Sequence, residues 1–132
     1  MCSGSIRVRR TSTVFTVQGI EGEKPYLRYQ VDRKAQVMRL LETYVPPELR
    51  GRGIARLLVE EAIRYAREQG LKIEPVCSYT VYYFVKNPDM REVLIDDLRN
   101  KDTKELEHLY EARKTLEKGS KHNTEVDTAG SL

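Results

Sequence analysis

The most constraining stretch of this sequence is VPPELRGRGIA, residues 45–55, where two prolines are followed by two glycines and then by a helical pattern. The prolines cannot continue a strand ladder, because each lacks a backbone N–H. Gly51 and Gly53 allow backbone angles and close approaches that a side chain would prevent. A helix that starts here begins with unpaired N–H groups and the positive end of its dipole. The stretch therefore predicts an anion-binding loop at a helix N-terminus, with Arg50 and Arg52 flanking the first glycine.

The size and charge of the chain limit the classes of protein it can belong to. Its 132 residues are enough for one domain with its own core, and its net charge of +3 does not by itself indicate nucleic-acid binding. No apolar run approaches the roughly 18 residues of a membrane span, and no secretion signal follows Met1. Cys2 lies in a terminus that we expect to be loose and is far from Cys77 in sequence, so we expect no structural disulfide. We expect a soluble, cytoplasmic, single-domain protein.

Three short β-rich segments precede the prolines. Residues 13–17, 26–31 and 37–45 combine β-branched, aromatic and aliphatic residues and are separated by short polar breaks. This arrangement predicts an antiparallel meander. Residues 1–11 are polar, basic and aperiodic, so we expect a frayed N-terminus.

The clearest predicted element is a helix over residues 53–69, which has a broad apolar stripe and ends at Gly70. A strand at 72–77 follows a helix, so we expect it to pair in parallel. Residues 79–85 have the composition of a strand, and propensity alone would not choose a helix, although helical spacing with Ser78 as N-cap is also compatible with the sequence.

The C-terminal third has a different character. Residues 102–105 form a possible capping box for a helix that would run to about Lys118 and stop at Gly119. We therefore predict a main domain at 12–95, an added helical segment at 96–119 and a disordered tail at 120–132.

With these elements placed, the chain resembles the GNAT superfamily of acetyltransferases. The superfamily signature is Arg or Gln, two residues, Gly, one residue, then Gly or Ala, and Arg50, Gly53 and Ala55 satisfy it. More narrowly, the chain resembles the very small, stand-alone GNAT-like proteins, which have a Thr-x-Val-Pro-x-x-Leu-Arg-Gly-x-Gly run followed by Pro-x-Cys and an aromatic residue. The matching positions are Thr43, Val45, Pro46, Leu49, Arg50, Gly51, Gly53, Pro75, Cys77 and Tyr79, with Tyr83 and Pro88 in agreement. The resemblance covers about residues 13–90.

The resemblance implies a fold and a co-substrate. It implies an α/β (α+β) fold in which antiparallel strands lead to the loop and its helix, then to a parallel-paired strand and a helix starting after Cys77. It also implies acetyl-CoA, with the pyrophosphate on the loop and the amide-rich pantetheine arm paired with the preceding strand end. The residues expected to bind CoA are Thr43, Tyr44, Val45, Arg50, Gly51, Arg52, Gly53, Ile54 and Ala55.

Acetyl transfer to an amine needs a neutral nucleophile and a proton for the leaving thiolate. Cys77 ends a strand at a predicted helix N-terminus, a position that favours thiolates, and it could carry the acetyl group or line the thioester site. Tyr83, with Tyr79 and Tyr82 as rivals, could protonate the leaving thiolate, and Glu42 could deprotonate the amine. Each also has a structural reading, as a buried small residue, a core aromatic or an ion-pair partner.

The chain departs from its resemblance at three positions. The small GNAT-like proteins commonly have His where this chain has Glu42 and Asn87, and Glu where it has Tyr44. No catalytic histidine can therefore be transferred to this chain. His108 and His122 lie far in sequence from the loop, and the sequence offers no metal-ligand cluster.

Two other functions are compatible with the sequence. The chain could be a CoA-binding or partner-binding module without catalysis, whose added helix recruits a partner or forms a homodimer through Leu106, Leu109 and Leu116. It could also contact nucleic acid through basic residues near the N-terminus, although aromatic interleaving is absent. Those basic residues are Arg7, Arg9 and Arg10. The sequence does not identify the acceptor amine.

Overall fold

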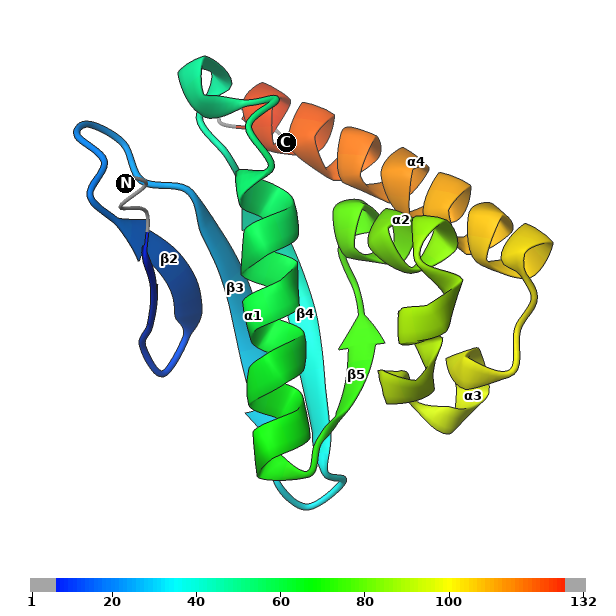
Figure 1. Ribbon diagram of the computed structural model, residues 1–132. Helices are drawn as coiled ribbons and strands as arrows, with labels where there is room; N and C mark the ends of the chain where they lie inside the picture. The colour runs from blue at the N-terminus through cyan, green and yellow to red at the C-terminus, as the bar shows by residue number, and fades with distance from the viewer. Residues whose placement is uncertain (1–6, 128–132) are drawn as a thin grey trace.

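The computed structural model describes residues 7–127, with side chains as far as Lys118. Five strands form one mixed sheet in chain order, and the helix over residues 54–69 lies across one of its faces (Figure 1). The strands are β1 (Arg7–Arg10), β2 (Val14–Gln18), β3 (Tyr26–Asp32), β4 (Val37–Tyr44) and β5 (Lys72–Pro75). The α-helices are α1 (Ile54–Gln69), α2 (Ser78–Lys86), α3 (Asp96–Arg99) and α4 (Thr103–Asp127), with 3-10 turns η1 (Pro47–Leu49) and η2 (Pro88–Val93). The predicted fold class, including the antiparallel meander and the parallel pairing of β4 with β5, is confirmed.

The core lies between the sheet and α1. Strand residues alternate between buried and exposed positions, so that one face of the sheet is apolar. Helix α1 turns a buried stripe toward that face and ends at Gly70, whose φ of 70° is left-handed as the sequence predicted. The buried residues of this interface include Phe15, Val17, Leu27, Tyr29, Met38, Leu40, Leu58, Val59, Ala62, Ile63 and Ala66.

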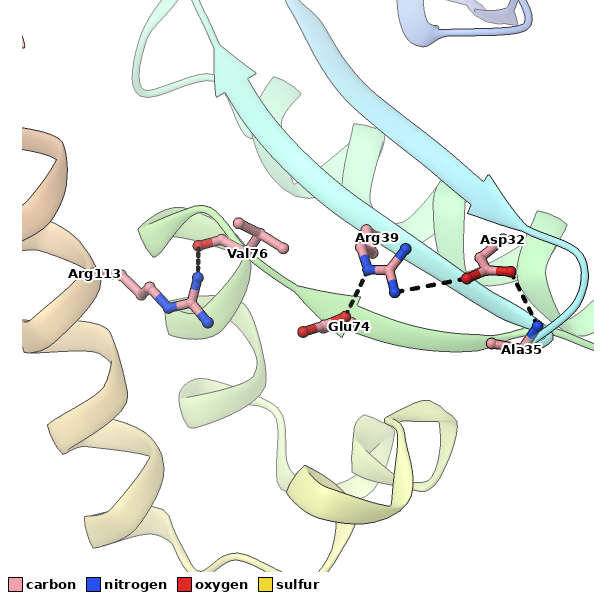
Figure 2. Close-up of polar contacts among 6 residues, drawn as sticks. All are labelled: Asp32, Ala35, Arg39, Glu74, Val76 and Arg113. Atoms are coloured by element: carbon pink, nitrogen blue, oxygen red, sulfur yellow. Dashed lines mark hydrogen bonds and ion pairs between the residues drawn. The ribbon is translucent and has the colours of Figure 1, made fainter. Parts of the chain in front are cut away.

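The opposite face of the sheet is polar. Arg39 of β4 donates through Nε to Glu74 of β5 at 2.9 Å and lies 3.8 Å from Asp32 of β3 (Figure 2). Arg28 and Glu42 pair in the same way between β3 and β4, at 3.3 Å. Such exposed pairs contribute little stability, but through them the charged side chains of this face pair with one another across adjacent strands.

A β-bulge in β4 changes which residues of that strand face the core. The register passes from Tyr29 opposite Leu40 to Arg28 opposite Glu42, so Leu41 has no partner on β3. Beyond the bulge the alternation is reversed, and Thr43 lies opposite the buried Leu27 on the core face. The bulge therefore aims Thr43 toward the helices and Glu42 away from them.

Residues 78–86 form the helix α2, as the family resemblance implies, and not the strand that their composition favours. Packing decides between the two, because the helical form buries Thr80, Val81 and Phe84 completely. The carbonyl groups at the end of α2 are satisfied by Arg91, which donates to the backbone oxygens of Phe84 and Val85.

Two predictions about the chain ends are wrong. Residues 7–10, expected to be frayed, form the edge strand β1, whose only apolar side chain is the half-buried Val8. Its stability comes from backbone pairing with β2 and from Arg10, which stacks 4.2 Å above the Tyr65 ring and donates to the Tyr29 hydroxyl at 3.0 Å. A strand of this kind leaves almost no hydrophobic pattern in the sequence.

The second correction concerns the C-terminal helix. It begins with the predicted capping box, in which Asp102 and Glu105 exchange backbone-to-carboxylate bonds of 2.9 Å. It continues through Gly119 to Asp127, because a single glycine costs a helix only about 1 kcal/mol and does not end it. Residues 120–127 of the predicted tail are therefore helical, and 128–132 lie outside the described residues.

Helix α4 packs along α2 (Figure 1), which places part of the predicted dimer surface inside the protomer. Leu106 is 1% exposed and Leu109 is partly buried against the core, whereas Leu116 is 67% exposed. Of the three leucines, only Leu116 presents a largely free side chain.

We expect Leu106→Ala to lower the free energy of unfolding by about 3 kcal/mol, because it removes a buried side chain that the surrounding structure cannot replace. Leu116→Ala, on the same helix, should change it by less than about 0.5 kcal/mol. Urea unfolding of both variants measures the difference. Equal effects would mean that α4 is not docked against α2 as the structure describes.

Candidate active site

A cleft of about 420 Å³ opens where β4 ends and α1 begins. One wall is the end of β4, another is the loop before α1 together with its first turn, and Tyr79 of α2 completes the lining. The lining residues are Thr43, Tyr44, Val45, Leu49, Arg50, Gly51, Gly53, Ile54, Ala55, Arg56 and Tyr79. All the residues that the sequence predicted to bind CoA are among them except Arg52.

The loop before α1 presents backbone donors to this cleft. Gly51 and Gly53 have φ values of 82° and 77°, and Gly53 is the N-cap of α1 without any side-chain capping bond. Within the described part of the chain, no backbone N–H from Gly51 to Arg56 has an intramolecular acceptor. The helix dipole adds a partial positive charge at the same point. These donors match the needs of a bound phosphate group.

The end of β4 offers a second set of free backbone groups. Its pairing with β5 ends at Leu40 opposite Pro75, and the Leu40 carbonyl then accepts from both Val76 N (2.9 Å) and Cys77 N (3.1 Å). Beyond that point the two strands separate, so Thr43 and Tyr44 pair with β3 on one side only. An extended ligand rich in amides can pair with this open edge.

Cys77 lies at the point where the strands separate. It is 6% exposed, it is the N-cap of α2, and its Sγ lies 3.2 Å from the Thr43 hydroxyl and 3.4 Å from the Thr80 hydroxyl. Thr80 directs its own proton to the Cys77 carbonyl at 2.8 Å, which leaves its hydroxyl oxygen free to accept from the thiol. The thiol thus adjoins the cleft through Thr43 without lining it.

The tyrosines of α2 differ in their position relative to the cleft. Tyr79 lines it, whereas the hydroxyl of Tyr83 donates to Glu60 of α1 at 3.4 Å. Burial raises the pKa of Tyr79, and the cation of Arg56 offsets this in part. Burial, reinforced by the Glu60 carboxylate, raises the pKa of Tyr83. Both phenols are therefore protonated at neutral pH, and Tyr79 has access to the cleft.

Glu42 lies apart from this cleft. Because of the bulge it points to the opposite face from Thr43, where it accepts from Tyr26 at 3.2 Å and pairs with Arg28. Arg50 directs Nε to the Val45 carbonyl at 2.8 Å, so its charge lies at the mouth of the cleft. The Tyr44 hydroxyl donates to Glu23, which lies just before β3, at 3.0 Å.

The sequence of residues 14–93, more than half of the chain, matches the model of the GCN5-related N-acetyl-transferase family. The chain belongs to this family. Its fold is similar to the NMR solution structure of a GCN5-like candidate N-acetyltransferase from Staphylococcus aureus, with a TM-score of 0.57 and 23% sequence identity. The match covers 70% of this chain and 91% of the Staphylococcus chain. Helix α4 begins after the end of the family match, so the GCN5-related domain here carries an additional helix.

Several residues around the cleft were not predicted. Leu49 and Arg56 line it, and Arg56 also forms an exposed ion pair with Glu60 at 2.9 Å. Two residues of α4, Arg113 and Glu117, contact the segment around Cys77, and only the three-dimensional fold brings them there.

The described residues contain neither a metal-ligand group nor a candidate membrane span. Among the side chains that the structure describes, from Arg7 to Lys118, no group of three or more His, Cys, Asp or Glu residues is placed to hold a metal ion. No helix in that part of the chain is sufficiently long and apolar to cross a bilayer.

Proposed function

We propose that the chain is an acetyl-CoA-dependent N-acetyltransferase. One observation carries the proposal: the open edge of β4 and the unpaired backbone donors before α1 meet in a single cleft beside Cys77. Membership of the GCN5-related family supports the same reading. The alternative is a CoA-binding module without catalysis. It needs the same cleft, so only an experiment distinguishes it from the enzyme.

The two walls of the cleft would bind different parts of CoA. The backbone N–H groups from Gly51 to Ala55 would hold the pyrophosphate, and Arg56 and Arg50 would add charge. The end of β4 from Thr43 to Val45 would pair with the pantetheine amides. Arg50 donates to the Val45 carbonyl, so a pantetheine amide would either share this oxygen with Arg50 or displace it.

Transfer requires the amine nitrogen to attack the thioester carbonyl carbon while the carbon–sulfur bond to CoA breaks. The products are an N-acetyl amine and CoA thiol, and the proton lost by the amine balances the one gained by sulfur. We assign the proton donor to Tyr79, because it lines the cleft, in preference to the predicted Tyr83, which is bonded to Glu60. Glu42 would act as base only through water, since it lies on the other face of the sheet.

Cys77 provides a second route by way of the protein. Its thiolate would attack the thioester carbonyl, CoA would leave as the thiol, and the amine would then release the acetyl group from Cys77. The Thr43 contact at 3.2 Å supports this route, because it places the sulfur next to the strand edge that pantetheine would follow. The route needs a free thiol and therefore a reducing compartment such as the cytoplasm.

Calorimetry with CoA and with acetyl-CoA tests the cleft, and release of CoA thiol in the presence of amines tests the reaction. We expect dissociation constants in the micromolar range, as is common for co-substrates of this kind, and thiol release with at least one amine class. Absence of binding at high micromolar concentration would reject both the enzyme and the module. Binding without thiol release across alkylamines, lysine peptides and polyamines would favour the module.

A further inference from the structure

A second hollow, of about 350 Å³, lies on the other side of the β4–β5 separation. Its lining combines Leu41 of β4, Val76 of the β5–α2 junction and the α4 residues Arg113, Leu116 and Glu117. It shares no lining residue with the CoA cleft. Cys77 lines neither space, but its thiol contacts Thr43 of the cleft and its neighbour in sequence, Val76, lines the hollow.

The α4 wall of this hollow is fixed by bonds on both sides of Cys77. Arg113 donates through a terminal nitrogen to the Val76 carbonyl at 3.1 Å (Figure 2). Glu117 accepts from both the backbone N–H and the hydroxyl of Ser78, at 2.8 and 2.6 Å. One helical turn of α4 therefore hydrogen-bonds both neighbours of Cys77 in the chain, Val76 and Ser78.

These bonds also determine what kind of ligand the hollow can accept. The charged residues of the lining are Arg113 and Glu117, and both bond backbone groups of the chain. Their charges cancel, so the hollow carries no net charge. The rest of its lining, Leu41, Val76 and Leu116, is aliphatic. Leu116 is 67% exposed, so its side chain is available to contact a ligand in the hollow.

We propose that this hollow receives the acceptor, a primary amine at the end of an aliphatic stem, and that α4 determines which stems fit. The proposal rests on the proposed function, since an amine must approach the thioester from the side that pantetheine does not fill. The stem would lie between Leu41, Val76 and Leu116, with the nitrogen directed toward Cys77. Helix α4 lies beyond the family match at residues 14–93, so this wall belongs to the chain's own extension.

The test uses n-hexylamine as probe and methylamine as its stemless counterpart, on full-length protein labelled with ¹⁵N and saturated with CoA. We expect n-hexylamine to shift the amide signals of Leu41, Val76 and Leu116, and methylamine to shift them far less. Leu116→Gln should weaken n-hexylamine binding about fivefold, because it removes apolar contact at an exposed position that the fold does not need. Ala112→Gln, one turn earlier on α4 and outside the lining, is the matched control and should bind normally.

The same variants separate this proposal from the proposed function. In assays of CoA release, Leu116→Gln should raise the KM for n-hexylamine about fivefold and leave that for methylamine unchanged. Shifts confined to other residues, or equal behaviour of Leu116→Gln and Ala112→Gln, would overturn the α4 site even in an active enzyme. Shifts at the hollow without any CoA release would support the site and reject the acetyltransferase.

Discussion

We expect Gly53→Ala to weaken CoA binding by about tenfold or more. Gly53 is the N-cap of α1 with a φ of 77°, a conformation in which a side chain costs roughly 1 kcal/mol. In the free protein a Cβ at this position meets no atom within 4 Å, because it projects into open space. Gly53 lines the cleft proposed for the pyrophosphate, so we expect the added methyl to meet the ligand and not the protein. Calorimetry with CoA measures the loss.

Gly70→Ala is a closely matched control for this variant. Gly70 caps the other end of the same helix, has a φ of 70°, and likewise has no atom within 4 Å of an added Cβ. The two substitutions should therefore lower the melting temperature by similar amounts. Only Gly53→Ala should lose CoA affinity, and similar affinities in the two variants would show that the phosphate does not bind at the α1 N-terminus.

The parts of the fold that follow from local sequence were predicted well. The three central strands and α1 rest on alternating or helical apolar patterns, and Gly70 ends α1 through its own backbone preference. The prolines and glycines of residues 45–55 predicted the end of the strand and the start of α1, which the structure confirms, and the anion site at this loop stays a prediction. Helix α2 required the family resemblance, since the choice between helix and strand for residues 79–85 depends on burial against the sheet.

The parts that were missed depend on contacts between distant residues. The bulge at Leu41 has no sequence signal of its own, yet it decides that Thr43 and not Glu42 faces Cys77. The bond between Tyr83 and Glu60 likewise joins two helices. For the same reason, the sequence could nominate Cys77 and Tyr79 but could not show that Arg113 and Glu117 of α4 grip the segment beside them.

The position of Cys77 leads to the second large expected effect. If the acetyl group passes through this thiol, acetyl-CoA alone should add the mass of one acetyl group to the protein, and Cys77→Ala should remove both the adduct and turnover, lowering kcat about a hundredfold. CoA affinity should change by less than about twofold, because Cys77 does not line the cleft. Peptide mapping by mass spectrometry locates the adduct. Cys2 is the only other cysteine in the sequence, so the measurement is made in a Cys2→Ala background.

Cys77→Ser distinguishes the chemistry of the sulfur from its packing. A serine hydroxyl is close in size and can keep the contacts with Thr43 and Thr80, but it is a far weaker nucleophile at neutral pH. The covalent route therefore predicts that Cys77→Ser is as inactive as Cys77→Ala. Direct attack by the amine predicts no adduct in wild-type protein and near-normal turnover in Cys77→Ser, since the thiol then only shapes the site next to the thioester. An unmodified Cys77 in protein that binds acetyl-CoA would decide for direct attack.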